Sequence, residues 1–464
     1  MTETPSAVRA AKPWAPYVPS EEAPWNLRRV VHLHRRAGFA ATWSEIQRDL
    51  ADGPKASIDR ILAGKACSQG VPEGFSKTAA LLGDAAAASG DPARLKAWWI
   101  YRMLFGPDPL GERLALMWHN HFATSNLKVE NLDAMRRQNE GFRELARAPF
   151  GELLNRTVHD PALLIWLDAP ANRKGHPNEN LARELMELFT LGIGPFTEDD
   201  VKESAQALTG WTLAEDQFTE IAARHDSGEK TILGRKGRWK GDDVVRMLLE
   251  HPATAERLAM RICELLMSEG VVSSTEQHAL AQELRDNDLN IGRGVETVLR
   301  SEAFFAGRNL GRRVLGPVEF VIGAARALEL FEPPSSTLVL AEWAGRLGQD
   351  LFYPPNVGGW PAGRAWLTTR SLIGRANYAA ALVEGTRVGR PTALDALGLA
   401  LKHGQGSDLD PVTGFYLQLI LGIEPSPAWQ KRLTAALGST NGNKAEAARR
   451  MVALVMAMPE AQVN

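Results

Sequence analysis

The amino-acid sequence predicts a mainly α-helical protein, a multi-helix globular core with a small β-hairpin insertion. Apolar residues recur at helical spacing along most of the chain, as in Leu110, Leu114 and Met117. Helix-start signals precede several such stretches, and Thr42 with Glu45 three residues later forms a capping box. Short alternating runs, typical of strands, interrupt this pattern between about residues 213 and 241. With 464 residues, of which 44% are apolar and 23% charged, the chain can bury a sizeable core, which excludes a wholly disordered protein.

Three regions follow one another along the chain. Residues 1–26 contain five prolines and little periodicity, so we expect an extended N-terminal arm. Residues 27–305 should form the helical core, with the hairpin insertion at about 213–241 turning near Ser227. Residues 306–464 should form a C-terminal helical region that packs on the core.

Capping residues mark the helix boundaries within the core. Asp160, which precedes a proline, is a typical N-cap. Asn178 is a good N-cap for the stretch ENLARELMELFTLG, and Gly192 is its expected stop. Thr197 starts the next helix, which Gly210 ends.

The charge balance and the cysteine count exclude several classes of protein. Lys and Arg total 53 against 55 Asp and Glu, a net charge of -2, so nucleic acid is not an expected partner. Two cysteines exclude a disulfide framework and a zinc site built from cysteines. No apolar run approaches the ~18 residues of a membrane span, and no secretory signal is visible at the N-terminus. We therefore expect a cytoplasmic protein, or one that is exported with a partner.

The stretch NENLARELMELFTLG carries the first group of candidate site residues. On a helix, Glu184 lies about 60° from the face made by Leu181, Leu185 and Leu188, so its carboxylate should be buried and paired with a cation. Burial raises the pKa of a carboxyl group, which suits acid–base catalysis or metal binding. A buried structural glutamate is the alternative. Glu179 is a further catalytic candidate, and the substrate-binding candidates beside it are Asn178, Asn180 and Arg183.

Two histidines in MWHNHF form the second group. His119 and His121 lie about 200° apart around a helix, so they converge on one site only if the helix ends near Asn120. His121 shares an apolar face with Leu114, where a histidine is more often structural than functional. Under the functional interpretation both histidines are catalytic, and His121 faces the N-terminal end of the helix that begins at Asn178.

The third group is a basic run with no acidic residue from Lys230 to Lys240, where five bases occur. In a chain with a slight negative charge, this run favours an anionic ligand such as an acidic polysaccharide. His225 and Lys230 are then substrate-binding residues. A solvated charged loop is the alternative.

The segment LFYPPNVGGWPAGRAWL combines prolines and glycines, which fix an irregular backbone, with Trp360 and Trp366. The two tryptophans suit an aromatic platform that binds a substrate. A packed loop that joins the C-terminal helices to the core explains the same residues.

The order of the motifs resembles a known bacterial family. The chain contains RRAGF, ER-x-x-L-x-WHNHF, DP-x-L-x-x-WLD, NEN-x-ARELMEL-x-TLG, LTGW, HD-x-G-x-K-x-x-LG, HPATA and F-x-PPNVGGWP-x-G-x-x-WL, between about Arg28 and about Arg375. Together they resemble the family catalogued as domain of unknown function 1800. The resemblance implies export, or a sulfatase-like partner protein. Some relatives have histidine where this chain has Phe189, so a metal ligand at that position would be missing here.

From these motifs we predict an enzyme in which Glu184 and His121 perform acid–base or metal chemistry on an anionic or carbohydrate-like substrate. The alternatives are a non-catalytic accessory or export partner of a sulfatase-like enzyme, and a structural role for every motif. The chain lacks GxGxxG, a P-loop and GxSxG, so a nucleotide cofactor and a hydrolase nucleophile elbow are not expected. The sequence identifies neither a metal nor a cofactor.

Overall fold

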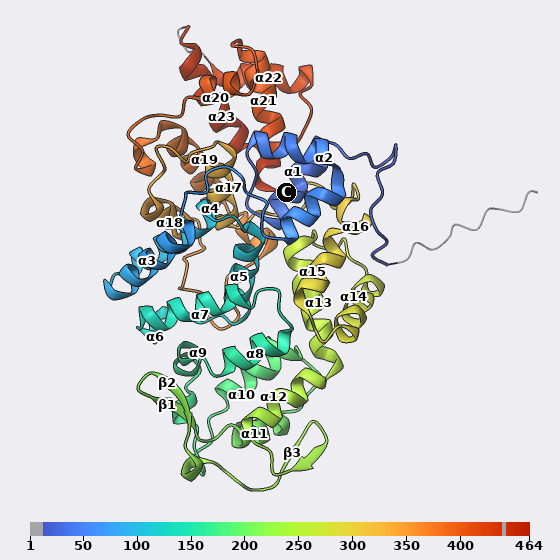
Figure 1. The fold of residues 1–464 in the computed structure, drawn as a ribbon, viewed down its shortest axis with the longest axis vertical. Coiled ribbons are helices and arrows are strands. Elements are labelled where there is room, and N and C mark those ends of the chain that lie inside the picture. Colours follow the sequence, from blue (N-terminus) through green and yellow to red (C-terminus); the bar gives the residue numbers. More distant parts are fainter. Residues whose placement is uncertain (1–12, 439–441) are drawn as a thin grey trace, which may run out of the picture.

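The computed structural model describes residues 13–438 and 442–464, which form a mainly helical protein and confirm the predicted fold class (Figure 1). The first nine helices are α1 (Leu27–Ala37), α2 (Trp43–Leu62), α3 (Phe75–Ala88), α4 (Pro92–Phe105), α5 (Pro109–His121), α6 (Asn126–Val129), α7 (Leu132–Glu144), α8 (Phe150–Val158) and α9 (Pro161–Trp166). The chain then forms η1 (Ala169–Ala171), α10 (Asn180–Glu184), the π-helix η2 (Leu185–Thr190) and α11 (Glu198–Ala207).

Short strands, 12 further α-helices and four short 3-10 helices complete the described part of the chain. The strands and the short helix between them are β1 (Trp211–Ala214), β2 (Gln217–Glu220), η3 (Ala222–Arg224), β3 (Lys230–Ile232) and β4 (Arg235–Gly237). The middle helices are α12 (Gly241–Glu250), α13 (Pro252–Leu266), α14 (Ser274–Asp286), α15 (Ile291–Leu299) and α16 (Glu302–Phe305). The last elements are α17 (Pro317–Ala327), α18 (Thr337–Arg346), η4 (Gly363–Trp366), α19 (Thr369–Glu384), η5 (Thr386–Val388), α20 (Ala396–Lys402), α21 (Leu409–Leu421), α22 (Pro427–Leu437), α23 (Lys444–Ala457) and η6 (Pro459–Gln462).

Helix starts follow the predicted capping residues. Thr42 and Glu45 form the capping box of α2, and the side chain of Asp160 accepts the Leu163 N–H at the start of α9. One helix, α10, starts later than its predicted cap. Asn178 accepts the backbone N–H of Asn180 at 2.9 Å, and α10 begins only at Asn180.

The helix that starts there also changes its geometry, because the turn from Leu185 to Thr190 is a π-helix. The Thr190 hydroxyl donates to the Leu185 carbonyl at 2.6 Å, and the Leu191 N–H donates to the Met186 carbonyl at 2.8 Å. This wider turn moves Leu188 to an intermediate position and buries Phe189 instead. The predicted apolar face therefore ends one turn early.

The predicted single hairpin turning near Ser227 is replaced by two hairpins. β1 pairs with β2, and β3 pairs with β4, each in antiparallel register. The first turn has positive φ at Glu215 and Asp216, and the second has positive φ at Leu233 and Gly234. These values are typical of two-residue turns that match the twist of the flanking strands. Ser227 lies in the connection between the two hairpins.

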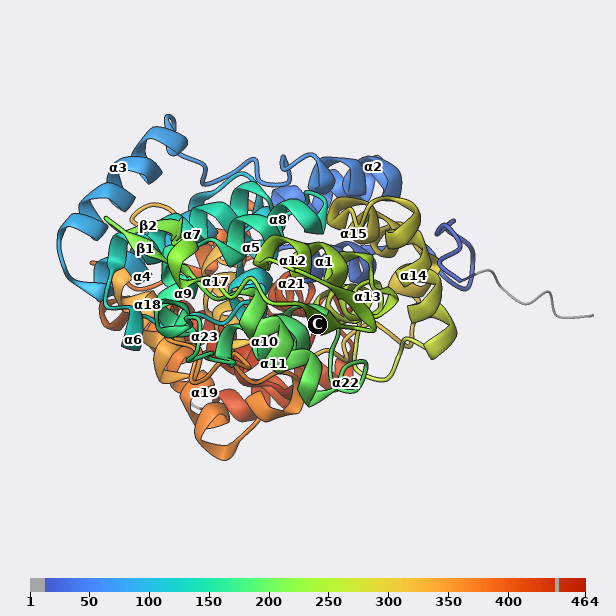
Figure 2. The same cartoon turned by 90° about the horizontal axis from the view of Figure 1, so that it is seen from below.

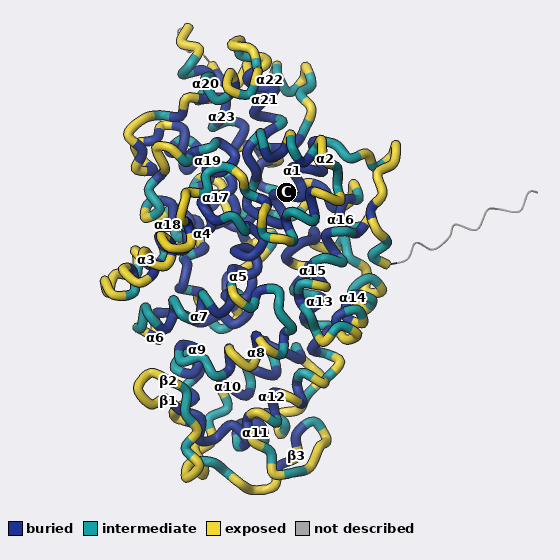
Figure 3. Tube along the Cα trace, in the orientation of Figure 1, coloured by how far each residue is buried: buried dark blue, intermediate teal, exposed yellow. Residues whose placement is uncertain are grey.

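A large apolar core runs through the molecule, with a smaller cluster among the C-terminal helices. Figure 3 shows α5 and α17 mainly buried, while the connection before β3 is exposed. α3 and the described segment before α1 lie at opposite edges of the molecule (Figure 1, Figure 2).

The predicted N-terminal arm is described only from residue 13, and residues 1–12 lie outside the described part. The Trp14 indole donates to the Glu276 carbonyl at 2.7 Å, and the Tyr17 N–H donates to the Arg300 carbonyl at 2.8 Å. This segment therefore packs against the α14–α16 region. None of the helices in the described ranges is long and apolar enough to cross a membrane.

Candidate functional site

A cleft of about 700 Å³, open to solvent, brings two of the sequence motifs together. It lies where α5, α13 and α17 meet the 352–368 loop, and α5 and α13 lie in the middle of Figure 1. We call it the arginine cleft; its lining residues are Arg113, Leu116, Met117, Asn120, Arg261, Glu264, Leu265, Arg313, Val314, Gly316, Glu319, Gln349, Trp360, Pro361, Ala362, Gly363 and Trp366. The ER-x-x-L-x-WHNHF motif supplies the α5 residues, and the GGWP motif supplies the loop.

One carboxylate organises the polar part of the arginine cleft. Glu319, which is 3% exposed, forms an ion pair with Arg113 and accepts two hydrogen bonds from Arg313 at 2.9 and 3.0 Å. The Gly316 N–H donates to the same carboxylate at 2.5 Å. Burial alone would raise the pKa of Glu319, but the two guanidinium groups outweigh burial and lower the pKa to about 2. The carboxylate is therefore ionised at neutral pH.

Positive charge exceeds negative charge in and behind the cleft. Arg261 pairs with Glu264 at 2.7 Å, so the two lining carboxylates already have arginine partners. Behind the cleft, three more buried arginines act electrostatically on Glu319: Arg35, Arg36 and Arg375. Their hydrogen bonds go mainly to backbone carbonyls, and none of the described acidic side chains forms a salt bridge with them. A buried positive charge that lacks an anionic partner creates a potential that attracts anions.

Four buried N–H groups of the cleft's lining side chains have no acceptor within the described structure. They are Arg113 Nε and Nη2, Arg261 Nε and Trp360 Nε1. No buried acceptor of a lining side chain is left without a donor in the same way. Unsatisfied buried polar groups are uncommon in folded proteins, and here all of them are donors. A group that offers acceptors and no donors would satisfy them.

Asn120 joins the two motifs that form the cleft. Its side-chain oxygen accepts the backbone N–H of Trp360 at 2.6 Å. Gly359 has φ of +84°, and a Cβ built there would lie 2.2 Å from the Asn120 Oδ1 atom. Only glycine fits both the conformation and the close approach. The Trp360 ring stacks on His119 with centroids 5.5 Å apart, so the loop rests on α5.

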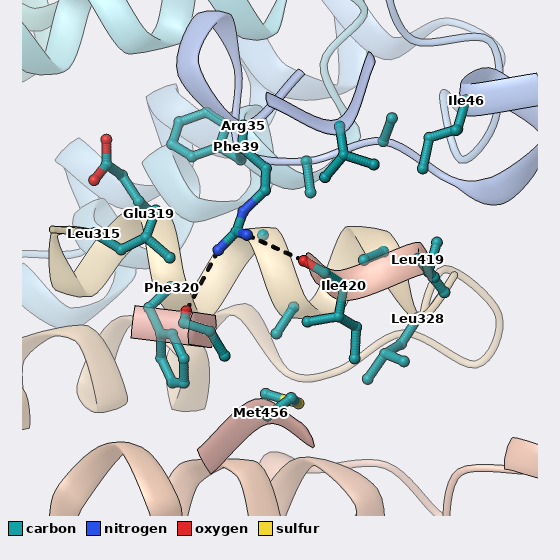
Figure 4. A pocket seen from close by; sticks show the side chains of 17 residues that line it. Arg35, Phe39, Ile46, Leu315, Glu319, Phe320, Leu328, Leu419, Ile420 and Met456 are labelled. Carbon is teal, nitrogen blue, oxygen red and sulfur yellow. Dashed lines mark hydrogen bonds between the residues drawn. The ribbon is translucent and has the colours of Figure 1, made fainter. Parts of the chain in front are cut away.

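A neighbouring cavity of about 540 Å³ is mainly apolar and lies between α1, α17, α21 and the C-terminal segment (Figure 4). The Arg35 guanidinium donates to the carbonyls of Ile420 at 3.1 Å and Ala461 at 3.4 Å. Figure 4 shows the Glu319 carboxylate at one end of this cavity, away from the Arg35 guanidinium. Glu319 thus lines both cavities, and its hydrogen-bond partners lie on the side of the arginine cleft.

The two predicted catalytic histidines do not converge. α5 continues to His121, so the helix does not end near Asn120. His119 is fully buried among Trp99, Phe352 and Trp360, and burial lowers its pKa to about 3. His121 lies within hydrogen-bond distance of the Phe189 carbonyl, at 3.0 Å, and burial lowers its pKa well below the ordinary value. His121 therefore contacts the end of the predicted helix rather than its N-terminal start.

The prediction that Glu184 is buried and paired is wrong in both respects. Glu184 is half-buried, and no hydrogen bond or ion pair joins it to a described residue. Burial and the nearby Glu187 raise its pKa. The shortened apolar face explains this position, because η2 turns the following residues away. Arg183 pairs with Glu179 at 3.0 Å and with Glu198 at 2.7 Å.

The other residues predicted near Glu184 take part in local contacts. The Asn178 side-chain oxygen accepts the Asn180 N–H just before α10, and the Asn180 amide donates to Asp168 at 3.0 Å. α10 lies in the lower part of Figure 1, and none of the residues predicted on it lines the arginine cleft. Their assignment as catalytic or substrate-binding residues stays a prediction.

The basic run from Lys230 to Lys240 is not free of acids in three dimensions. Lys230 is buried and donates to the backbone carbonyls of Asp226 and Gly228. Three of the other bases are paired with acids from other segments: Arg235 with Glu250, Lys236 with Glu229, and Lys240 with Glu220. The predicted anion-binding patch is therefore largely neutralised. His225 is within 3.0 Å of the Thr209 carbonyl, which indicates a structural contact.

Trp360 and Trp366 both line the arginine cleft, as the aromatic-platform interpretation requires, and both are also buried loop residues. Arg113, Arg261, Arg313 and Glu319 were not identified from the sequence. Arg113 follows Glu112 in the quoted ER-x-x-L motif, which is the one signal that pointed to it. The other three come from separate segments with no local pattern.

No cluster of metal-ligating side chains supports metal binding in the described part of the chain. Within residues 13–438 and 442–464, no three His, Cys, Asp or Glu side chains are grouped as a metal site requires. Phe189, the position at which the family resemblance led us to consider a missing metal ligand, is buried against His121 and Phe122.

A comparison with protein-family models gives one match, and it covers residues 32–463. The matching family is described as "Protein of unknown function (DUF1800)". Comparisons with curated proteins and with solved structures gave no match.

Proposed function

The chain belongs to the DUF1800 family of proteins of unknown function, so from the geometry of its site we propose that it binds a small anionic ligand in the arginine cleft. Ligand pockets typically combine apolar walls with a few convergent polar groups. The cleft of about 700 Å³ between α5, α13 and the GGWP loop matches that description.

The four unsatisfied N–H donors carry this proposal. Each buried donor without an acceptor costs about 1–3 kcal/mol, so a ligand that accepts hydrogen bonds from several of them at once would be stabilised. Arg113 Nε and Nη2 belong to one guanidinium, which can hold two oxygens of an oxyanion side by side. Arg261 Nε and Trp360 Nε1 supply further donors from α13 and the loop.

Charge supports the same ligand class. Arg113, Arg261 and Arg313 face only two lining carboxylates, and the buried arginines behind the cleft add positive charge. Charges act more strongly in a partly buried cleft than in water, so a ligand with one or two negative charges would be attracted and held.

We propose ligand binding rather than the acid–base catalysis predicted from the sequence, because neither Glu184 nor His121 lines the arginine cleft. Binding an acidic ligand suits an accessory protein as well as an enzyme. The sulfatase-like partner and the acidic polysaccharide stay predictions from the sequence.

Isothermal titration of the full chain with acetate, inorganic phosphate and sulfate tests the proposal. We expect binding of at least one of these anions, weakened about tenfold or more by Arg261→Gln, because each hydrogen bond to a charged group contributes about 1.5–3 kcal/mol. Arg308→Gln is the control, because Arg308 is an exposed arginine paired with Glu276 outside the cleft. No binding at millimolar concentrations, or equal binding by Arg261→Gln and the parent, would rule the proposal out.

A further inference from the structure

Much of the lining of the arginine cleft is apolar and would not be covered by a simple inorganic anion. The arginines account for one part of its lining, and the remainder is mainly hydrophobic: Leu116, Met117, Leu265, Val314, Trp360, Pro361, Ala362 and Trp366. A sulfate or phosphate bound at the donors would leave this apolar lining in contact with water.

Building on the proposed function, we infer that the ligand is an organic carboxylic acid whose apolar or aromatic body lies against Trp366 and its hydrophobic neighbours. A carboxylate presents two oxygens side by side, as the Nε and Nη2 donors of Arg113 require. The body then covers the apolar lining, to which Trp360 and Trp366 contribute.

The same lining argues against a sugar acid. Sugar hydroxyl groups are donors as well as acceptors, so a bound sugar needs acceptors from the protein. Both oxygens of Glu319 and the Oε2 atom of Glu264 are already engaged by arginines, which leaves Glu264 Oε1 as the one carboxylate oxygen of the described lining without an arginine partner. The side-chain oxygens of Asn120 and Gln349 accept the backbone N–H groups of Trp360 and Val318. A carbohydrate body would therefore lose hydrogen bonds to water on entering, whereas an apolar body would not.

A panel of ligands on the unmodified full chain separates the head group from the body. Titration calorimetry should show benzoate and octanoate binding about tenfold or more tightly than acetate, because apolar surface leaves water. Glucuronate should bind no more tightly than acetate, and benzyl alcohol, which lacks the charge, should not bind measurably.

A paired variant locates the body in the cleft. Trp366→Leu should weaken benzoate binding by a larger factor than acetate binding, because only the body of benzoate extends over the apolar lining that Trp366 supplies. Trp429→Leu is the control, because Trp429 packs against the separate C-terminal cluster. Melting temperatures of both variants check that each is folded, and the panel on the parent decides the question if either is not.

The outcomes distinguish this inference from the proposed function. If acetate, benzoate and octanoate bind equally, or if glucuronate binds most tightly, the organic-acid inference is wrong while the anion-binding function stands. If only phosphate or sulfate binds, the inference fails in the same way. If no anion binds, the proposed function fails and the inference with it.

Discussion

Replacing Glu319 with glutamine tests whether one carboxylate organises the arginine cleft. Glu319 is almost fully buried and interacts with Arg113, Arg313 and the Gly316 N–H. Burial raises its pKa, but these partners outweigh burial and lower the pKa from 4.5 to about 2. A pKa lowered by this much adds about 3 kcal/mol to the free energy of unfolding at neutral pH. Glutamine keeps the volume of the side chain and removes its charge.

Urea unfolding at pH 7 should therefore show Glu319→Gln about 3 kcal/mol less stable than the parent. Glu342→Gln is the matched control; Glu342 forms an exposed pair with Arg346, so its loss should stay below about 0.5 kcal/mol.

The pH dependence gives a second test with a definite sign. Because the folded pKa of Glu319 lies below the unfolded value, its contribution is fully present above pH 4.5 and is lost as the pH falls towards about 2. The stability gap between the parent and Glu319→Gln should narrow over this range. Equal unfolding midpoints for Glu319→Gln and Glu342→Gln, or a gap that does not change with pH, would refute the reasoning.

Three further predictions concern single residues. Gly359→Ala should melt at a lower temperature than Gly192→Ala, because both glycines have positive φ but only the Cβ at 359 meets Asn120 Oδ1 at 2.2 Å; equal melting temperatures would contradict the close approach. His119→Phe should lose less stability than the parent as the pH falls from 6.5 to about 3. In the parent, the pKa of His119 is lowered to about 3 in the folded state, so the unfolded chain binds the proton first and becomes favoured. Parallel pH profiles of the two proteins in urea unfolding would contradict this prediction. Glu184→Gln should be at least as stable as the parent at pH 7, because its raised pKa shows that the fold disfavours the charged form; a clear loss in a thermal melt would reveal an ion-pair partner.

Local sequence signals predicted the parts of the fold that local interactions decide. The capping box at Thr42 and the N-cap at Asp160 form hydrogen bonds between near neighbours, and both occur where expected. The π-helix after Glu184 was not predicted, because regular helical spacing cannot show that a turn will widen. Its hydrogen bond from Thr190 to Leu185, and the burial of Phe189 beside His121, arise together only in the folded chain.

The candidate site could be predicted only in part, for a related reason. Asn120, Trp360 and Trp366 lie within motifs that the sequence singles out, but the contact between the two motifs joins residues 240 positions apart. Glu319 lies in an apolar stretch that reads as an ordinary core helix, and nothing nearby in the sequence indicates that arginines will surround it. Its partners become visible only when α5 and α17 are placed side by side.

The distribution of charge shows most clearly why the sequence alone directed attention to the basic hairpin rather than to the arginine cleft. The densest basic run in the chain extends from Lys230 to Lys240, and it attracts attention because no acidic residue lies within it. In the fold, Glu250 and Glu220 form ion pairs with bases of this run. The arginines of the cleft are scattered along the chain and inconspicuous in the sequence. In the fold, Arg113 and Arg313 converge on Glu319, and donors of Arg113 and Arg261 are left without an acceptor. Surface pairs in water contribute little, whereas an uncompensated charge under a cleft is costly unless a ligand meets it. An anion is therefore expected where buried positive charge exceeds its partners, which is at Arg113 rather than at the basic hairpin.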